Sequence, residues 1–408
     1  MQSNRILSIA TTQVLLALIG CGPYILTAHK KASYPDVVEA EVIQRIILVG
    51  DAGDPSAEKT LEDVTKRASN KKLKDVTTIF FLGDNIYGDG LPAGVNPEAC
   101  KKSEESAECK KWKEWKRVKP YLDAQIKVVK DSGVKGIFIP GNHDWDSARK
   151  RGLARVRAQA EYVTKELGDG AFLSKEGCPG PEPYTFGEIR VIALDTQWLL
   201  HKWDDKWDVN CKKNGTGVKY KSNTDVYADL KKLLATAAEK PTIVVAHHPT
   251  KTHGQHGYQY HWRHFIFPFT LWNKTPNLWI PLPLVGGLFQ YIWGRPSEQD
   301  ILHLDNKTMV DELNRAMASH KGPLVYAAGH DHGSQVMTSK NDKQFALVSG
   351  GASKKKITFI KKGEDKIMSH RHTGYMELDY LKRDKKNKLI LLVFDTGKPD
   401  PVFSMIIE

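Results

Sequence analysis

The stretch Thr78-Ile79-Phe80-Phe81-Leu82-Gly83-Asp84-Asn85-Ile86-Tyr87 joins an apolar run to a short polar loop. An apolar run of β-branched and aromatic residues predicts a strand that is buried on both faces of a sheet. The polar side chains then lie where the chain leaves the sheet, which is where open α/β sheets place their chemistry. The stretch therefore predicts an α/β fold with functional residues at a strand end.

The same arrangement occurs five times along the chain. The other four predicted strands are Ile46–Val49, Gly136–Pro140, Thr242–Val245 and Leu324–Ala328. They run into the islands Gly50-Asp51-Ala52-Gly53, Gly141-Asn142-His143-Asp144, Val244-Val245-Ala246-His247 and Gly329-His330-Asp331-His332. A single island would carry little information, but five in succession predict one shared site.

The islands contain donor types that suit iron, zinc or manganese. Carboxylates, an amide, a phenol and imidazoles are borderline-to-hard ligands. Two neighbouring ions need one ligand that touches both, and a strand-end carboxylate such as Asp84 can bridge ions about 3.5–4 Å apart. His330 and His332 are alternate residues, so both rings can face the same ions if the segment is extended. The pattern predicts a two-metal centre.

Together the islands resemble the calcineurin-type metallophosphoesterase superfamily, and more narrowly its purple acid phosphatase branch, over roughly residues 43–350. Most superfamily members open with Asp-x-His, whose His binds the first metal, but position 53 of this chain is Gly. Tyr87 resembles the tyrosinate that replaces this His in the purple branch, and phenolate is a strong donor for Fe(III). The resemblance implies a four-layer α/β/β/α sandwich of two mixed sheets flanked by helices, in a single catalytic domain.

The resemblance also implies seven metal ligands around two ions. They are Asp51, Tyr87 and His332 for Fe(III) in the first site, Asn142, His247 and His330 for Fe(II), Zn or Mn in the second site, and the bridging Asp84. The catalytic residue it implies is His143, which contacts phosphate and helps the leaving group depart. Asn85, His253 and His256 are implied as substrate-binding residues.

The implied reaction is hydrolysis of phosphate monoesters by attack of a metal-bound hydroxide, on a phosphorylated small molecule or a phosphoprotein. A phosphodiesterase or nucleotide pyrophosphatase on the same scaffold is the main alternative. A non-catalytic cell-surface binding module and an iron-based peroxide chemistry are two further ones. The sequence has no zinc-finger spacing and no basic heptad region, so we expect no nucleic-acid partner. We expect a monomer.

The N-terminus predicts export. Arg5 precedes the apolar stretch Ile6–Gly20, which is short for a membrane span but suits the apolar part of a signal peptide. Leu18-Ile19-Gly20-Cys21 resembles the bacterial lipobox, which implies cleavage before Cys21 and a lipid on that residue. We therefore expect a signal peptide over 1–20, a lipidated Cys and tether over 21–41, and the catalytic domain over 42–408. The expected location is the bacterial cell envelope (periplasm or outer-membrane lipoprotein), with secretion as the alternative.

The cysteine count fits an oxidising compartment. The chain has five cysteines, and setting Cys21 aside for the lipid leaves four, an even number. Four cysteines allow three pairings. We favour Cys100–Cys109 and Cys178–Cys211, because each pair lies within one insertion between strands.

An apolar aromatic insertion at about 265–293 interrupts the pattern of strands and helices. Its only charged residue is Lys274, and its four prolines exclude a single spanning helix. It is either a flap folded over the core or a loop that dips into the membrane interface beside the lipid anchor. The formal net charge of +12 would favour phosphorylated substrates or an anionic membrane surface.

Local patterns predict the remaining elements. Helices are expected over Glu58–Ala68, Trp112–Val129 with an interruption at Pro120, Ala148–Leu167 and Thr224–Ala238. A hairpin is expected from Tyr184–Phe186 and Arg190–Thr196. Further strands are expected near Gln344–Ser349, Ile357–Ile360, Tyr375–Tyr380 and Leu389–Phe394.

Overall fold

The computed structural model describes residues 39–173, 176–214, 216–236, 239–260, 266–267, 280–282, 296–338, 344–353, 357–361, 366–383 and 387–407. The predicted signal peptide, Cys21 and most of the tether lie outside the described residues, as does most of the 265–293 insertion. The expectations for these segments therefore stay predictions. Within the described ranges, no helix combines the length and apolarity that crossing a membrane requires.

The first sheet has six strands in the order β13-β12-β11-β1-β2-β3. Its strands are β1 (Val42–Val49), β2 (Thr77–Leu82), β3 (Lys135–Ile139), β11 (Gly374–Leu381), β12 (Lys388–Asp395) and β13 (Phe403–Ile406). Strands β1, β2 and β3 pair in parallel, whereas β11, β12 and β13 extend the sheet with antiparallel pairs. The sheet is therefore mixed.

The second sheet has seven strands in the order β10-β8-β9-β7-β6-β5-β4. Its strands are β4 (Glu182–Phe186), β5 (Ile189–Ala193), β6 (Thr242–Val245), β7 (Leu324–Ala328), β8 (Ser334–Thr338), β9 (Gln344–Ser349) and β10 (Lys366–His370). Strands β5, β6, β7 and β9 are parallel, and β4, β8 and β10 pair antiparallel at or near the edges. This sheet is mixed as well.

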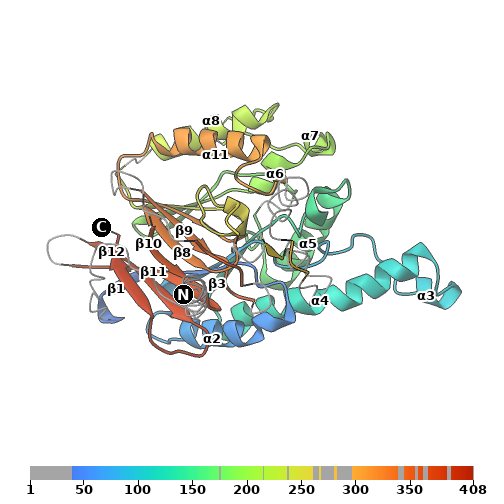
Figure 1. The fold of residues 1–408 in the computed structure, drawn as a ribbon, viewed down its shortest axis with the longest axis horizontal. Helices are drawn as coiled ribbons and strands as arrows, with labels where there is room; N and C mark the ends of the chain where they lie inside the picture. The colour runs from blue at the N-terminus through green and yellow to red at the C-terminus, as the bar shows by residue number, and fades with distance from the viewer. Residues whose placement is uncertain are drawn as a thin grey trace, which may run out of the picture.

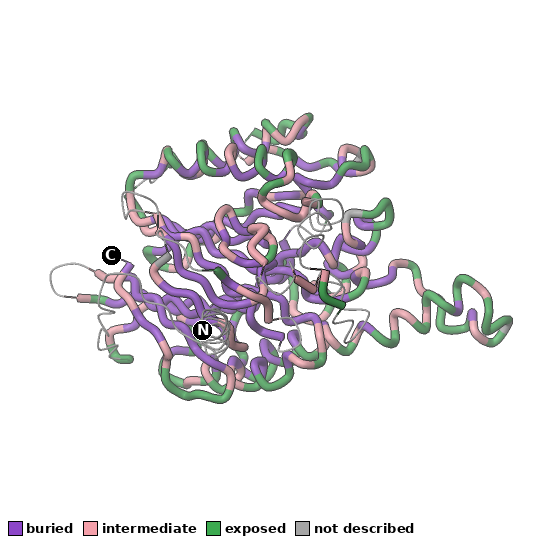
Figure 2. Tube along the Cα trace, in the orientation of Figure 1, coloured by how far each residue is buried: buried purple, intermediate pink, exposed green. Residues whose placement is uncertain are grey.

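The alternation of side chains along each strand builds a layered core. Ile46 and Leu48 of β1 pack in the core between the two sheets, whereas Ile47 and Val49 pack in the core toward the helices. Helices α2 (Glu58–Ala68) and α4 (Ala107–Ser132) lie on one outer side, and α8 (Asn223–Ala235) and α11 (Leu304–Met317) lie on the other (Figure 1). Figure 2 shows buried strands at the centre and helices with exposed outer faces. The predicted four-layer α/β/β/α sandwich in a single domain is confirmed.

Helix α5 and several shorter elements complete the fold. They are α3 (Ala99–Lys102), α5 (Gly152–Leu167), α6 (Thr196–Leu200), α7 (Asp205–Asp208) and the 3-10 turns η1 (Glu39–Glu41), η2 (Pro55–Ala57), η3 (Lys74–Val76), η4 (Asp146–Ala148) and η5 (Gln255–Gly257). Helix α4 extends beyond the body of the molecule and carries α3 at its far end (Figure 1).

Both predicted disulfides are present. Cys100–Cys109 joins α3 to the first turns of α4, and Cys178–Cys211 joins the segment before β4 to the segment after α7. Cys100–Cys109 closes a loop within the insertion between β2 and β3, as expected, whereas the segment closed by Cys178–Cys211 contains β4 and β5, so the reason given for the second pairing was wrong although the pairing is right.

The predicted helix over Glu58–Ala68 is confirmed, but two other helix predictions need correction. Helix α4 continues through Pro120. Proline has no N–H, so the carbonyl of Lys116 has no helical partner at position 120. Both residues are exposed, and water can therefore satisfy this carbonyl. Helix α5 begins at Gly152 rather than at Ala148, because Ala148 ends the turn η4 and Arg149 is extended, with φ −79° and ψ 167°.

The predicted strand Ile357–Ile360 is wrong. Thr358 N donates to the His332 carbonyl at 3.0 Å, and Lys361 N donates to the His253 carbonyl at 2.8 Å. The backbone of this segment therefore pairs with loops of the candidate site instead of with a neighbouring strand. Strands β8, β10 and β13 and helix α11 were not predicted.

Candidate metal centre

The topology brings the five polar islands to one place. Strands β1, β2 and β3 are parallel neighbours in one sheet, and β6 and β7 are parallel neighbours in the other, so their carboxyl ends share an edge. The loops touch at this edge: a β-carbon at Gly83 would lie 2.5 Å from His247 Nδ1 and 2.8 Å from Gly141 N. Glycine at position 83, where φ is +89°, allows this close approach.

Three of the predicted ligands have left-handed backbone conformations. The φ values are 62° at Asp51, 51° at Asp84 and 68° at His330. Such conformations are uncommon for residues other than glycine and cluster at functional sites, where the surrounding structure enforces them. Each of these residues therefore turns its side chain sharply out of the strand that precedes it.

The first group of predicted ligands is Asp51, Tyr87 and His332. Tyr87 Oη lies 3.0 Å from Asp51 Oδ1 and 3.0 Å from His332 Nε2, and the last two atoms are 3.5 Å apart. Burial, together with the charges of Asp51 and Asp84, raises the pKa of Tyr87 well above its usual value. A phenolate at this position would therefore need a cation beside it.

Gly53 explains how Tyr87 reaches this group. A β-carbon at Gly53 would lie 2.5 Å from the backbone of Asn85 and Ile86. Gly53 N donates to the Asp84 carbonyl at 3.0 Å, and Tyr87 N donates to the Gly53 carbonyl at 2.9 Å. The first and second islands thus interlock through a position that has no room for a side chain.

The second group of predicted ligands is Asn142, His247 and His330. Asn142 Oδ1 lies 2.9 Å from His247 Nε2 and 3.1 Å from His330 Nδ1, and these two ring nitrogens are 3.1 Å apart. His247 Nδ1 donates to the Leu82 carbonyl at 2.8 Å, and His330 Nε2 donates to the Gln299 carbonyl at 2.9 Å. Because carbonyls only accept, each ring turns its other nitrogen toward the group, and a neutral ring offers a lone pair there.

The donor set of the second group fits a metal ion. Burial, together with the neighbouring histidines, lowers the pKa of His330 well below its usual value, so its ring is neutral. With both rings neutral, two imidazole lone pairs and the Asn142 amide oxygen would face one another, and a cation among them, a metal ion or a proton, removes the repulsion. Nitrogen and oxygen donors of this kind suit zinc, iron or manganese.

Asp84 joins the two groups. Its Oδ1 lies 3.4 Å from His247 Nε2, and Asp51, Asp84 and His247 each offer a ligand atom within 4.8 Å of the others. Burial alone would raise the pKa of Asp84, but positive charge on His247 and His143 and the hydrogen bond from His143 N outweigh it and lower the pKa. The structure thus brings all seven predicted ligands into one connected cluster with an ionised carboxylate at its centre.

His143 is held beside Asp84 with one ring nitrogen free. Its backbone N donates to Asp84 Oδ1 at 3.0 Å, and its Nδ1 hydrogen bonds to the Gly88 carbonyl at 2.8 Å. Its Nε2 lies 4.0 Å from Asp84 Oδ2, and the side chain is 31% exposed. This placement lets Nε2 reach a group bound at the centre.

The three residues predicted to bind substrate differ in their placement. His256 stacks on His330 with ring centroids 3.8 Å apart, and its Nδ1 lies 2.9 Å from Asp300 Oδ1. The backbone of His253 is fixed by Gln335 at 2.9 Å. Asn85 is buried and its Nδ2 donates to the Ile139 carbonyl and to Asp144, at 2.8 and 3.2 Å. This geometry gives Asn85 a structural role and does not support a phosphate contact.

Two buried carboxylates outside the predicted ligand set hold the loops of the site. Asp144 accepts hydrogen bonds from the backbone of Gly141, Asn85 and Ile86 at 2.7–3.1 Å, which ties the second island to the third. Asp331 accepts from Thr252 Oγ1 at 2.5 Å and from Gln255 N at 3.2 Å. In the sequence, Asp144 and Asp331 are marked only by their position next to predicted ligands. That position did not reveal which backbone and side-chain groups they bind.

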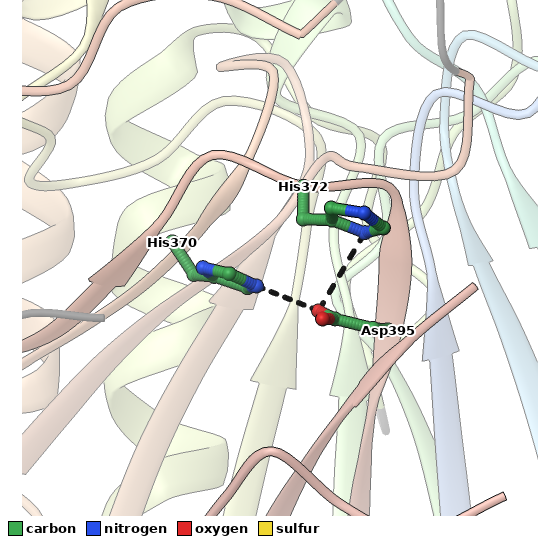
Figure 3. Close-up of side chains that lie close together, drawn as sticks. All are labelled: His370, His372 and Asp395. Atoms are coloured by element: carbon green, nitrogen blue, oxygen red, sulfur yellow. Dashed lines mark hydrogen bonds and ion pairs between the residues drawn. The ribbon is translucent and has the colours of Figure 1, made fainter. Parts of the chain in front are cut away.

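A different group of possible ligands lies at the ends of β10 and β12. Figure 3 shows His370 and His372 directed at the Asp395 carboxylate, with His370 Nε2 2.7 Å and His372 Nδ1 3.7 Å from Oδ1. Lys398 Nζ donates to Oδ2 at 2.9 Å, and His372 Nδ1 also hydrogen bonds to the Thr373 carbonyl at 2.9 Å. Because Lys398 and the two imidazoles already surround the carboxylate, we interpret the group as a clamp between the β10–β11 turn and β12, although His370 Nδ1 is buried without a hydrogen-bond partner among the described residues.

The Asp395→Asn variant should lower the free energy of unfolding by about 1–3 kcal/mol at pH 7, because it weakens charge-assisted hydrogen bonds to a buried carboxylate. Burial alone would raise the pKa of Asp395, but the hydrogen bonds from His370 and Lys398 outweigh it and lower the pKa. A lowered pKa gives stability that is present above the ordinary value near 3.8 and is lost as the pH falls through the folded value.

Urea unfolding of the wild type and the variant at pH 7 and at pH 3 measures this effect. The difference in unfolding free energy should narrow in acid, and the exposed control Asp75→Asn should change stability by less than about 0.5 kcal/mol. An equal deficit at both pH values would contradict the role given to the carboxylate charge.

Comparisons with known proteins bear on the family and the fold of the chain. Residues 44–334 match the family model described as "Calcineurin-like phosphoesterase". A search of curated proteins gave no match. Among solved structures, "GAP50 the anchor in the inner membrane complex of Plasmodium" is 15% identical and has a TM-score of 0.52, over 89% of this chain and 88% of that one. At this identity the likeness shows the shared fold alone.

Proposed function

This chain belongs to the calcineurin-like phosphoesterase family of metal-dependent phosphoesterases, and from that premise we propose that it hydrolyses phosphate monoesters at a centre of two metal ions. The observation that carries the proposal is the convergence of lone pairs from Asn142, His247 and His330 beside the ionised Asp84. With neutral rings such a convergence is unfavourable in the protein alone, and a bound metal ion would relieve it.

The first site would hold Fe(III) through Asp51, Tyr87 and His332, as in the purple acid phosphatase branch. The support is the fit between Gly53 and the loop that carries Tyr87. A histidine at position 53 would collide with that loop, whereas glycine lets the phenol enter the cluster. The second site would hold Fe(II), Zn or Mn through Asn142, His247 and His330, with Asp84 shared by both ions.

Two cations bound there would supply Lewis acidity toward phosphoryl oxygens and an activated water. Protein side chains would bind the phosphate and supply the proton. His143, fixed by donation from Nδ1 to the Gly88 carbonyl, would as an imidazolium donate from Nε2 to the phosphate or to the leaving-group oxygen. His256, and with it His253, can bind the phosphate from the side of the His330–His332 pair.

Metal analysis of the native protein together with its visible spectrum tests the proposal. We expect two metal ions per chain, iron in at least one site, hydrolysis of a monoester, and a tyrosinate-to-iron charge-transfer band. Tyr87→Phe should remove the band, and Tyr121→Phe, a half-buried tyrosine of α4, should leave it unchanged. A colourless protein with two zinc or two manganese ions would refute the iron assignment. A protein without metal and without hydrolysis would refute the proposed function.

The same preparation separates the rival functions. A phosphodiesterase or nucleotide pyrophosphatase would bind the same ions but show a higher kcat/KM on diesters than on monoesters. A binding module would hydrolyse neither substrate, and an iron-based redox enzyme would turn over peroxide without cleaving esters. The substrate of the monoesterase would be a phosphorylated small molecule or a phosphoprotein.

We further propose that the protein is exported to the bacterial cell envelope and anchored by a lipid on Cys21. The two disulfides support an oxidising compartment, because such bonds persist there and are rare in the cytosol. Contact of the 265–293 insertion with the membrane is a part of this proposal that liposome co-sedimentation can test. Equal partitioning of the soluble domain with and without the insertion would contradict that contact.

A further inference from the structure

The segment Ser297-Glu298-Gln299-Asp300, here called the 297–300 turn, follows the apolar insertion and returns the chain to the metal centre. It meets three histidines of the site through hydrogen bonds. These bonds join His330 Nε2 to the Gln299 carbonyl at 2.9 Å, His248 Nε2 to Gln299 Oε1 at 2.7 Å, and His256 Nδ1 to Asp300 Oδ1 at 2.9 Å. No sequence motif assigned a role to this turn.

The turn has a fixed shape of its own. Asp300 Oδ2 accepts from the backbone N and from Oγ of Ser297 at 2.8 and 2.9 Å, and Asp300 N donates back to the Ser297 carbonyl at 2.9 Å. Asn306 of helix α11 donates from Nδ2 to the Glu298 carbonyl at 3.0 Å. Asp300 thus closes the turn with one carboxylate oxygen and presents the other to His256.

Gln299 links the scaffold to the ligand His330. Thr196, at the start of α6, has Oγ1 2.9 Å from His248 Nδ1, and His248 Nε2 in turn holds the Gln299 side chain. The Gln299 carbonyl then accepts from His330 Nε2, which leaves His330 Nδ1 unprotonated and facing the other ligands. Outer hydrogen bonds of this kind fix the tautomer and orientation of a metal-binding imidazole.

Asp300 orients the ring of His256. Its hydrogen bond holds His256 parallel to within 30° of His330 at 3.8 Å, with the His332 ring 6.5 Å away. Ile301 N donates to the His256 carbonyl at 3.0 Å, so the backbone after the turn restrains the same residue. Because Nδ1 is used by Asp300, Nε2 is the polar atom of His256 that remains for a ligand.

We propose that the 297–300 turn positions the metal centre for phosphate: Gln299 orients the ligand His330, and Asp300 orients His256 toward the substrate. The inference rests on the proposed phosphatase function and adds two positioning residues to it. Connecting the insertion to α11 does not require hydrogen bonds to ring nitrogens of three site histidines, so these bonds support a role in positioning.

Asp300→Ala tests the part of the proposal that concerns His256. We expect kcat/KM for a monoester and the affinity for inorganic phosphate to fall by about 10–100-fold, with the metal content unchanged. Asp300→Asn, which keeps an acceptor for His256 Nδ1, should recover part of the loss. In a His256→Ala background, Asp300→Ala should add less than about twofold, because a positioning residue acts only through its partner.

Gln299→Ala tests the part that concerns His330 without any measurement of activity. Competition with a chelator should show that the affinity of the second site for Zn²⁺ or Mn²⁺ falls by about tenfold. The matched control for both variants is Asp305→Ala, a half-exposed carboxylate just after the turn that pairs with Lys202 instead of with a site histidine. This control should keep wild-type metal and phosphate affinity.

The outcomes separate this inference from the proposed function. A wild type without metal and without hydrolysis would refute the function, whatever the variants do. An active wild type whose Asp300→Ala and Gln299→Ala variants match it, or whose Asp300→Ala loss persists in the His256→Ala background, would overturn the positioning role alone. Should Asp300→Ala fail to fold, Asp300→Asn and its cycle with His256→Ala decide the question.

Discussion

The Asp84→Asn variant should lose bound metal and more than about 10³-fold in kcat/KM. Asp84 is the one predicted ligand that lies between the two groups, and its charge is the negative charge that both ions would share. Asparagine keeps the shape of the side chain, can still accept from His143 N, and tolerates the left-handed backbone at this position. The loss should therefore reflect the missing charge and not a misfolded loop.

Metal content and kinetics of the purified variant provide the measurement. Circular dichroism and thermal unfolding of the metal-free proteins show whether the fold is kept. Asp89→Asn is a suitable control because Asp89 is a neighbouring carboxylate that pairs with Arg149 at 3.1 Å and touches no predicted ligand. A variant of Asp84 that keeps two metals and full activity would show that the bridge has been assigned to the wrong residue.

Replacement of His143 by Ala should slow turnover by about 10²–10⁴-fold while both metals stay bound. The side chain of His143 contributes no atom to either ligand group, so metal affinity should change little. Its Nε2 lies 4.0 Å from Asp84 Oδ2 and becomes a donor toward the centre when the ring is an imidazolium, because Nδ1 donates to the Gly88 carbonyl. The variant should therefore separate chemistry from metal binding.

The leaving group offers an internal control for this variant. A substrate with an acidic phenol as leaving group needs little proton donation, whereas an alkyl phosphate needs much more. The loss in His143→Ala should therefore be larger for the alkyl phosphate than for the aryl phosphate. An equal loss on both would argue that His143 binds phosphate but does not protonate the leaving group.

The sequence predicted the parts of the site that depend on strand ends. Asp51, Asp84, Asn142, His247 and His330 follow apolar runs directly, and parallel neighbouring strands place such residues at one edge whatever the loops do. Tyr87 and His332 are within three residues of these positions and were found with them. The buried strands of an α/β fold follow from the same runs, whereas the two-sheet architecture and the role of each ligand were implied by the family resemblance.

The sequence could not predict contacts made between distant loops. Ile357–Ile360 has the composition of a strand, but its backbone bonds go to loops of the site that lie far away along the chain. Gln299 and Asp300 belong to no sequence motif and do not follow a predicted strand. Only the fold shows that they contact His330 and His256. Asn85 stands beside Asp84 in sequence, yet its amide turns inward because Asp144 and the Ile139 carbonyl attract it.

The left-handed backbone at Asp51 and Asp84 also constrains how this protein can change over evolutionary time. Asparagine and glycine are the residues that best tolerate this conformation, whereas glutamate or a β-branched residue would be strained there. Genetic drift that abolishes turnover should thus pass through Asn or Gly at these positions, leaving the scaffold intact. Relatives that had lost activity but kept this fold would therefore have Asn or Gly at position 51 or 84. Glu at either position would indicate that the loop had changed its backbone conformation.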